Sequence, residues 1–276
     1  MRKITVLAFG ATTAGLLAAG GSSSAHAAVG HTANTAFTST HMQTAFTTSQ
    51  SSNWSGYNQG TLEKGTTFHE VSGTWVVPAA HQRVSGQTEY SATWVGIGGG
   101  CLDTSCSSTD QTLIQAGTEQ DVNSKGVASY GAWWEIIPQP STPIALPVAA
   151  GQRVHVDVAE TATREVWSIV IKNLSTGRSF STTVSYSSSY ATAEWIVETP
   201  LVIGSGGTGV AALPNLGKVV IDPGTANKAN PALTAAEEIQ LIDSRGHVIA
   251  TPSAPDRERD GFGDCTYATS CATPAS

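Results

Sequence analysis

The stretch AEWIVE, residues 193–198, carries the clearest signal for the fold. Side chains of a β-strand alternate between its two faces, so Glu194, Ile196 and Glu198 share one face. Trp195 points to the other. The stretch therefore predicts a strand that carries two carboxylates on one face, about 13 Å apart at about 3.3 Å per residue.

Short β-branched and aromatic runs of this kind recur along the chain, separated by clusters of Gly, Pro, Ser and Asn. Many short strands with turn residues between them are typical of a sandwich or barrel, so we predict an all-β fold. Residues 233–239 suggest a helical turn or the entry to a strand that ends near Ile242. The runs are 71–77, 90–97, 112–115, 132–137, 153–158, 166–173, 180–186, 193–197 and 218–221.

The first 27 residues have the three parts of a secretory signal: Arg2 and Lys3, an apolar run from Ile4 to Ala19, and Ala-His-Ala at residues 25–27. A membrane anchor is the alternative, but the apolar run is short for a bilayer, and no later stretch reaches roughly 18 apolar residues. We predict a signal peptide over 1–27 and a secreted, extracellular protein without a membrane partner after processing. The uncharged, Thr-rich residues 28–50 are interpreted as a leader or propeptide.

Charge is sparse. Charged residues make up 13% of the 276 residues, and the net charge is −7. Globular chains average about 25% charged residues, so the composition argues against a coiled coil or a charge-stabilised disordered chain. The acidic balance, without a Lys/Arg cluster, excludes a nucleic-acid partner. A monomer is the default expectation.

Four cysteines fall into two local pairs: Cys101 and Cys106 lie five positions apart, and Cys265 and Cys271 lie six positions apart. An exported protein favours disulfides. Four cysteines allow three connectivities, and closeness in sequence favours Cys101–Cys106 and Cys265–Cys271. Neither spacing suits a zinc site. Residues 254–276 are expected to form a polar C-terminal tail that the second pair holds.

Polar groups stand among aromatic residues on two further strands. Glu135 shares a face with Trp133, and Gln115 shares a face with Gly117 and Glu119. Burial beside aromatics raises a carboxyl pKa and suits acid–base work, while an amide donates to an oxyanion without carrying charge. Ordinary exposed positions on half-buried strands are the alternative interpretation. The sequence has no nucleophile elbow, zinc-protease motif or phosphate-binding loop.

Five motifs in the same order resemble the glutamic peptidases, or eqolisins, which are secreted fungal acid proteases with bacterial relatives. The likeness extends over about residues 53 to 250. It rests on NWSG at 53–56, WVGI at 94–97, LIQAG at 113–117, AWWExxP at 132–138 and AEWIVE at 193–198.

The resemblance implies an antiparallel β-sandwich of two packed sheets, concanavalin- or jelly-roll-like, over 51–253, with its active site on the concave face. It implies a catalytic pair of Gln115 and Glu198. Glu198 would act as general base and then general acid, and Gln115 would hold the water and stabilise the oxyanion. Polypeptide substrates at acidic pH, and no metal or organic cofactor, follow from the same likeness. Substrate-side positions by motif match are Trp54, Trp94, Glu119 and Glu135.

The chain departs from the fungal pattern at several points. Gly98 stands where the family has an acidic residue after WVGI, and Glu119 replaces an aspartate. Serines at 187–189 replace a cysteine of the family, and residues 28–50 have no Lys or Arg with which a propeptide could block the site.

Two other functions fit the same residues. A non-catalytic sandwich could bind carbohydrate or peptide through exposed tryptophans. A glycoside hydrolase could use Glu135 with Glu194 or Glu198, at a separation of roughly 5–10 Å. Gln115 discriminates between them, because only a peptidase needs it within hydrogen-bond or one-water reach of Glu198.

Overall fold

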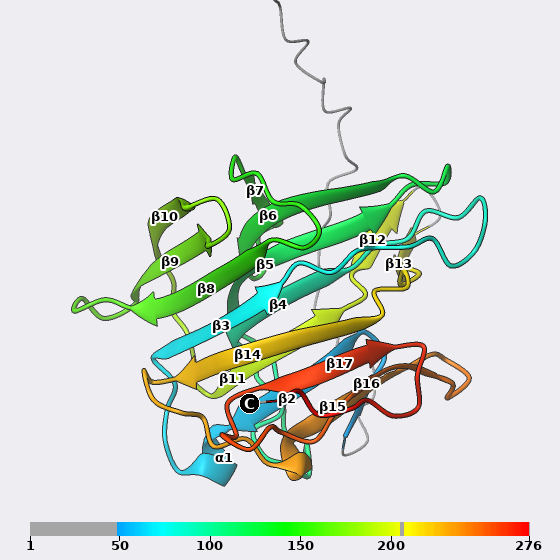
Figure 1. The fold of residues 1–276 in the computed structure, drawn as a ribbon. Helices are drawn as coiled ribbons and strands as arrows, with labels where there is room; N and C mark the ends of the chain where they lie inside the picture. Colours follow the sequence, from blue (N-terminus) through cyan, green and yellow to red (C-terminus); the bar gives the residue numbers. More distant parts are fainter. Residues whose placement is uncertain (1–48, 205–206, 276) are drawn as a thin grey trace, which may run out of the picture. The chain divides into compact units, whose positions relative to one another are not determined.

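The computed structural model describes residues 49–204 and 207–275, and its elements are almost all β-strands (Figure 1). The predicted all-β class is confirmed. The signal peptide expected at 1–27 and residues 28–48 of the expected leader lie outside the described residues. The elements are β1 (Gln50–Ser51), β2 (Trp54–Gly60), α1 (Thr61–Lys64), β3 (Glu70–Val76), β4 (Ala92–Gly98), β5 (Leu113–Val122), β6 (Ala128–Ile136), β7 (Thr142–Ile144), β8 (Arg153–Glu160), β9 (Val166–Asn173), β10 (Arg178–Ser185), β11 (Thr192–Glu198), β12 (Leu201–Gly204), β13 (Gly207–Val210), β14 (Lys218–Ala226), the 3₁₀ turn η1 (Ala235–Glu237), β15 (Glu238–Ile242), β16 (Val248–Pro252) and β17 (Phe262–Thr266).

The strands form two packed layers that are continuous through one edge. Their order is β10-β9-β8-β3-β14-β17-β16-β15-β2-β11-β4-β5-β6-β7, and β15 pairs with both β16 and β2 at the turn between the layers. Neighbours along this path are antiparallel, while the short β1 runs parallel to β15. The predicted antiparallel sandwich is therefore confirmed.

The core lies between the layers and draws on both. Trp75 and Val156 of one layer pack with Val95 and Trp195 of the other. The indole Nε1 of Trp195 donates to the Ser72 carbonyl at 2.7 Å, so this large side chain is buried with its polar atom satisfied. Trp195 thus faces the core, as the alternation in residues 193–198 predicts.

The expected end of the sandwich domain at residue 253 is wrong, because the C-terminal segment adds a strand to the sheet. Within the expected polar tail, β17 lies between β14 and β16 in the sheet (Figure 1). Phe262 of β17 joins the core, and Asp264 is fully buried. A strand this short, with a charged residue at its centre, does not show apolar alternation, which is why its sequence reads as a tail.

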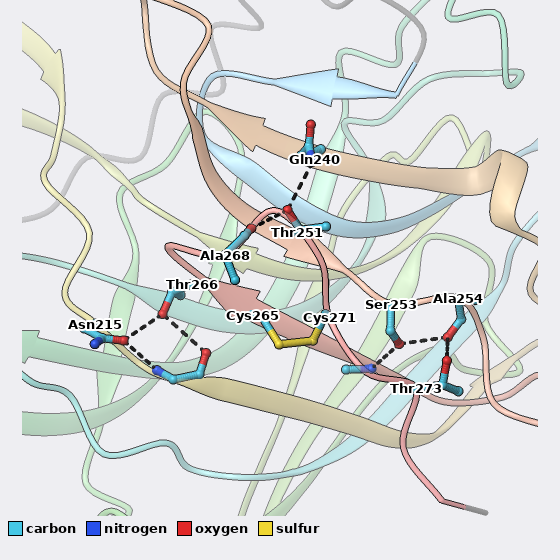
Figure 2. Close-up of a disulfide and its surroundings, with 12 residues drawn as sticks. Asn215, Gln240, Thr251, Ser253, Ala254, Cys265, Thr266, Ala268, Cys271 and Thr273 are labelled. Atoms are coloured by element: carbon cyan, nitrogen blue, oxygen red, sulfur yellow. Dashed lines mark hydrogen bonds between the residues drawn. A yellow bond between two sulfur atoms is a disulfide. The ribbon is translucent and has the colours of Figure 1, made fainter.

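Both expected disulfides are present, with Cα atoms 4.8 Å apart in Cys101–Cys106 and 5.4 Å apart in Cys265–Cys271. Figure 2 shows the second bridge, which ties β17 to the residues that follow it. The Thr251 hydroxyl of β16 donates to the Ala268 carbonyl at 2.7 Å nearby. No helix within residues 49–204 and 207–275 is long and apolar enough to cross a bilayer.

Candidate active site

The strand register places the predicted site residues on one face of the layer that contains β4. β4 lies between β11 and β5. Across these strands Glu198 pairs with Ala92, which pairs with Glu119. Residues directly opposite each other in a sheet point to the same face, so the two glutamates project from one side.

A second row lies four residues along β4. Glu194 pairs with Gly96, Gly96 with Gln115, and Gln115 with Glu135. Gly96 and Ala92 have the same parity on β4, so both rows share a face. This is the face opposite Trp195, and it has an apolar cluster separate from the main core.

Two donors hold the Glu198 carboxylate. Trp94 Nε1 donates to Oε2 at 2.7 Å, and Asn53 Nδ2 donates to Oε1 at 3.3 Å. Glu198 is 2% exposed, so these bonds act where little water competes with them. Asn53 was not among the predicted site residues, although it opens the NWSG motif.

Trp54 and Trp94 form an aromatic corner beside Glu198. Their ring centroids are 4.9 Å apart at 78°, an edge-to-face contact. Gly117 makes room for this corner, because a Cβ there would lie 2.6 Å from Trp94 Cβ. None of the seven tryptophans, all within the described residues, is exposed. The binding-module interpretation, which needs exposed tryptophans, therefore loses its main support.

The amide of Gln115 is held by Glu135. Gln115 Nε2 donates to Glu135 Oε2 at 2.5 Å, and both side chains are fully buried. This bond fixes the direction of the amide before any ligand arrives. Glu135, expected on the substrate side, thus contacts the predicted catalytic amide directly.

A cavity of about 30 Å³ opens beside these residues, and Glu198, Glu135 and Glu119 all line it. A space of this size accommodates one or two water molecules. The structure thus brings three of the predicted carboxylates to one cavity, and one of them, Glu135, accepts the hydrogen bond from Gln115. The lining also includes residues that the sequence did not single out: Ser91, Ala92, Asp121, Ser141 and Pro200, together with Trp133.

Residues 52–259 match the model of the peptidase A4 family. The chain belongs to the peptidase A4 family. It is 28% identical to aspergillopepsin-2 of Aspergillus niger over 170 residues, which is 54% of this chain. The chain spans about half of that relative, 56% of its length.

Solved structures show the same fold. The crystal structure of scytalido-glutamic peptidase with a peptide-based transition-state analogue has a TM-score of 0.58 at 21% identity, and covers 78% of this chain and 98% of its own. SCP-B, an eqolisin in a complex with the tripeptide Ala-Ile-His, has a TM-score of 0.55 at 19% identity over the same shares.

Gly98 shows why this A4-family chain lacks an acidic residue after WVGI. Its φ is +100°, and a Cβ there would lie 2.1 Å from the Thr112 carbonyl oxygen. The backbone therefore excludes a side chain. The Asp110 Oδ2 atom lies 3.1 Å from that same Cβ position, so another segment brings a carboxylate to the place. The motif alone does not predict that Asp110 lies beside Gly98, because Asp110 follows it by twelve positions.

Burial raises the pKa of several carboxyl groups on this face. It raises the pKa of Glu119, and it raises the pKa of Asp121 well above its ordinary value, with the charge of Glu119 adding to the effect. Burial also raises the pKa of Glu194 well above the usual range. Burial therefore favours the protonated form of Glu119 and Asp121, which line the cavity, and of Glu194 in the second row.

Proposed function

We propose that this protein is a secreted glutamic endopeptidase that hydrolyses peptide bonds at acidic pH through Gln115 and Glu198. The observation that carries the proposal is the cavity of about 30 Å³, which Glu198 lines together with the hydrogen-bond partner of Gln115. A general base needs its water within hydrogen-bond reach, and this cavity offers that place.

In the proposed mechanism, the Glu198 carboxylate takes a proton from water as the water oxygen attacks the peptide carbonyl carbon. The carbonyl oxygen becomes an oxyanion, which the Gln115 amide stabilises by donating a hydrogen bond. Glu198 then returns the proton to the leaving amine, and the C–N bond breaks. Bonds from Asn53 and Trp94 hold the carboxylate in place.

We also propose polypeptides as substrates. An extended chain would lie along the face that carries Glu119, over the cavity that Glu198 and Glu135 line. The peptide-based analogue bound by scytalido-glutamic peptidase and the tripeptide bound by SCP-B support this choice of substrate class. In this arrangement Trp94 and Glu135 position the two catalytic residues, and Glu135 also lines the cavity. No cofactor is required.

We also propose that the protein is secreted and monomeric. Processing would remove residues 1–27 and a leader up to about residue 50. Two local disulfides suit an oxidising compartment.

The test is cleavage of casein and of short peptides by the processed protein from pH 2 to pH 8. We expect Glu198→Gln to abolish turnover. Glu258→Gln, at an exposed loop position, is the matched control and should retain full activity. Equal rates for the wild type and Glu198→Gln at every pH would reject the assignment.

A further inference from the structure

Three aspartates converge away from the candidate active site. Asp222 lies on β14, and Asp256 and Asp260 belong to the loop of residues 256–261, DRERDG, that leads into β17. One carboxylate oxygen from each lies within 4.8 Å of the others. Like charges this close repel one another unless protons or a cation separate them.

The loop is built so that the carboxylates approach. The Asp256 amide donates to the Gly261 carbonyl at 2.8 Å, and the Gly224 amide of β14 donates to the Asp260 carbonyl at 2.7 Å. A Cβ at Gly261 would lie 2.6 Å from Asp256 Oδ2 and 2.7 Å from Asp222 Cγ. Only glycine at this position lets the loop bring Asp256 against Asp222.

Asp256 gives a second, independent indication of a ligand. It is 4% exposed, and its Oδ1 accepts from the Asp260 amide at 3.2 Å. Its Oδ2 is buried and has no hydrogen-bond partner among residues 49–204 and 207–275. A buried carboxylate oxygen without a donor is costly, and a cation would satisfy it.

Arg259 of the loop does not serve as the cation that these carboxylates need. The guanidinium of Arg259 is turned to the carbonyls of Leu233 and Ala232, at 2.9 and 2.7 Å. The ion pairs found in the described part of the chain involve none of the three aspartates.

We propose that Asp222, Asp256 and Asp260 form a calcium site that holds the C-terminal strand β17 against β14. Calcium takes oxygen ligands at about 2.3–2.6 Å, so two ligand atoms on one ion are separated by up to about 5 Å. The spacing within 4.8 Å fits this range. Magnesium needs about 2.0–2.1 Å in a near-ideal octahedron, which suits a partly buried cluster of three carboxylates less well. Water and loop carbonyls would complete the shell.

Protons compete with the cation. A carboxylate binds calcium only when it is ionised, so calcium affinity should fall as the pH is lowered.

The test is thermal unfolding of the processed protein at pH 6.5 with EDTA, CaCl₂ or MgCl₂. At calcium 100 times above its Kd, we expect Tm to rise by roughly 5–10 °C over the EDTA value. Terbium luminescence sensitised by tryptophan reports binding directly. An unchanged Tm with calcium, or an equal rise with magnesium, would overturn the proposal.

Variants locate the site. Asp260→Asn should remove the calcium-dependent rise and the terbium signal, and Asp256→Asn should do the same if the variant folds. Asp243→Asn, in another loop, is the matched control and should keep both. A rise in Asp260→Asn equal to that of the wild type would show that calcium binds elsewhere and would refute the assignment. None of these readouts depends on peptidase activity.

Discussion

Replacing Asp264 by asparagine should prevent a large part of the loss of stability that the protein undergoes as pH rises. Asp264 lies on β17, fully buried. Burial raises its pKa from 3.8 to about 7, against an opposing contribution from the Ser55 hydroxyl. The unfolded chain therefore releases this proton near pH 3.8, whereas the folded protein retains it until about pH 7. The folded state is favoured fully below pH 3.8, and that advantage is lost as pH rises to about 7.

The size of the effect follows from the two pKa values. They differ by about three pH units, and each unit is worth about 1.4 kcal/mol. Between pH 3 and pH 8 ionisation of Asp264 should therefore lower the free energy of unfolding by about 4 kcal/mol. That is a large fraction of the roughly 5–15 kcal/mol that stabilises a typical domain.

Urea unfolding at pH 3, 5, 6 and 8 measures the contribution of Asp264 to the free energy of unfolding. All proteins should carry Glu198→Gln, which prevents self-digestion on the proposed mechanism. Other buried carboxyls, such as Glu194, also weaken the fold at high pH, so the informative quantity is the difference between Asp264→Asn and its parent at each pH. We expect this difference to change by about 4 kcal/mol between pH 3 and pH 8 in favour of the variant. Asp243→Asn, at a partly exposed position where hydrogen bonds lower the carboxyl pKa, is the control and should not gain stability at high pH. Parallel curves for Asp264→Asn and its parent would refute the reasoning.

Three further substitutions test the site and the core. Gln115→Ala should lower kcat about 10²–10³-fold with a smaller change in KM, measured by peptide cleavage, and an unchanged kcat would exclude an oxyanion role. Trp94→Phe keeps an aromatic ring but removes the donor to Glu198 Oε2. A donor to a carboxylate favours its charged form, so the acidic limb of the kcat profile should move to higher pH, and a profile that stays in place would contradict this. Trp195→Ala should cost about 3–5 kcal/mol in urea unfolding, and a loss below about 1 kcal/mol would mean that the core collapses around the gap.

The sequence predicted the parts of this fold that alternation governs. In residues 193–198 it placed Glu194, Ile196 and Glu198 on the face opposite Trp195, and the register and the two apolar clusters agree with that. Disulfide pairing was also predictable, because short loops bring the cysteines together. Alternation depends only on neighbouring residues, so it is visible in a single strand.

Other features depend on partners far away in the sequence. Asp264 reads as a surface residue, and only the fold shows that β2 and Ser55 cover it. Asp110 reaches the position beside Gly98 because the loop before β5 turns back on the sheet. Asn53 bonds to Glu198 across 145 positions. Such pairings arise from topology, and one sequence carries no direct record of them.

Two groups of carboxyls stabilise the fold in opposite pH ranges. Glu194 and Asp264 stabilise the fold while they are protonated, so they favour an acidic medium. The Asp222, Asp256 and Asp260 cluster binds a cation only when ionised, so its contribution would grow as pH rises. Calcium should therefore protect the protein most at and above about pH 7, where the advantage of protonated Asp264 has been lost. On the proposed secretion from a neutral compartment into an acidic medium, calcium would stabilise the fold at neutral pH, and protonated Asp264 would stabilise it at acidic pH.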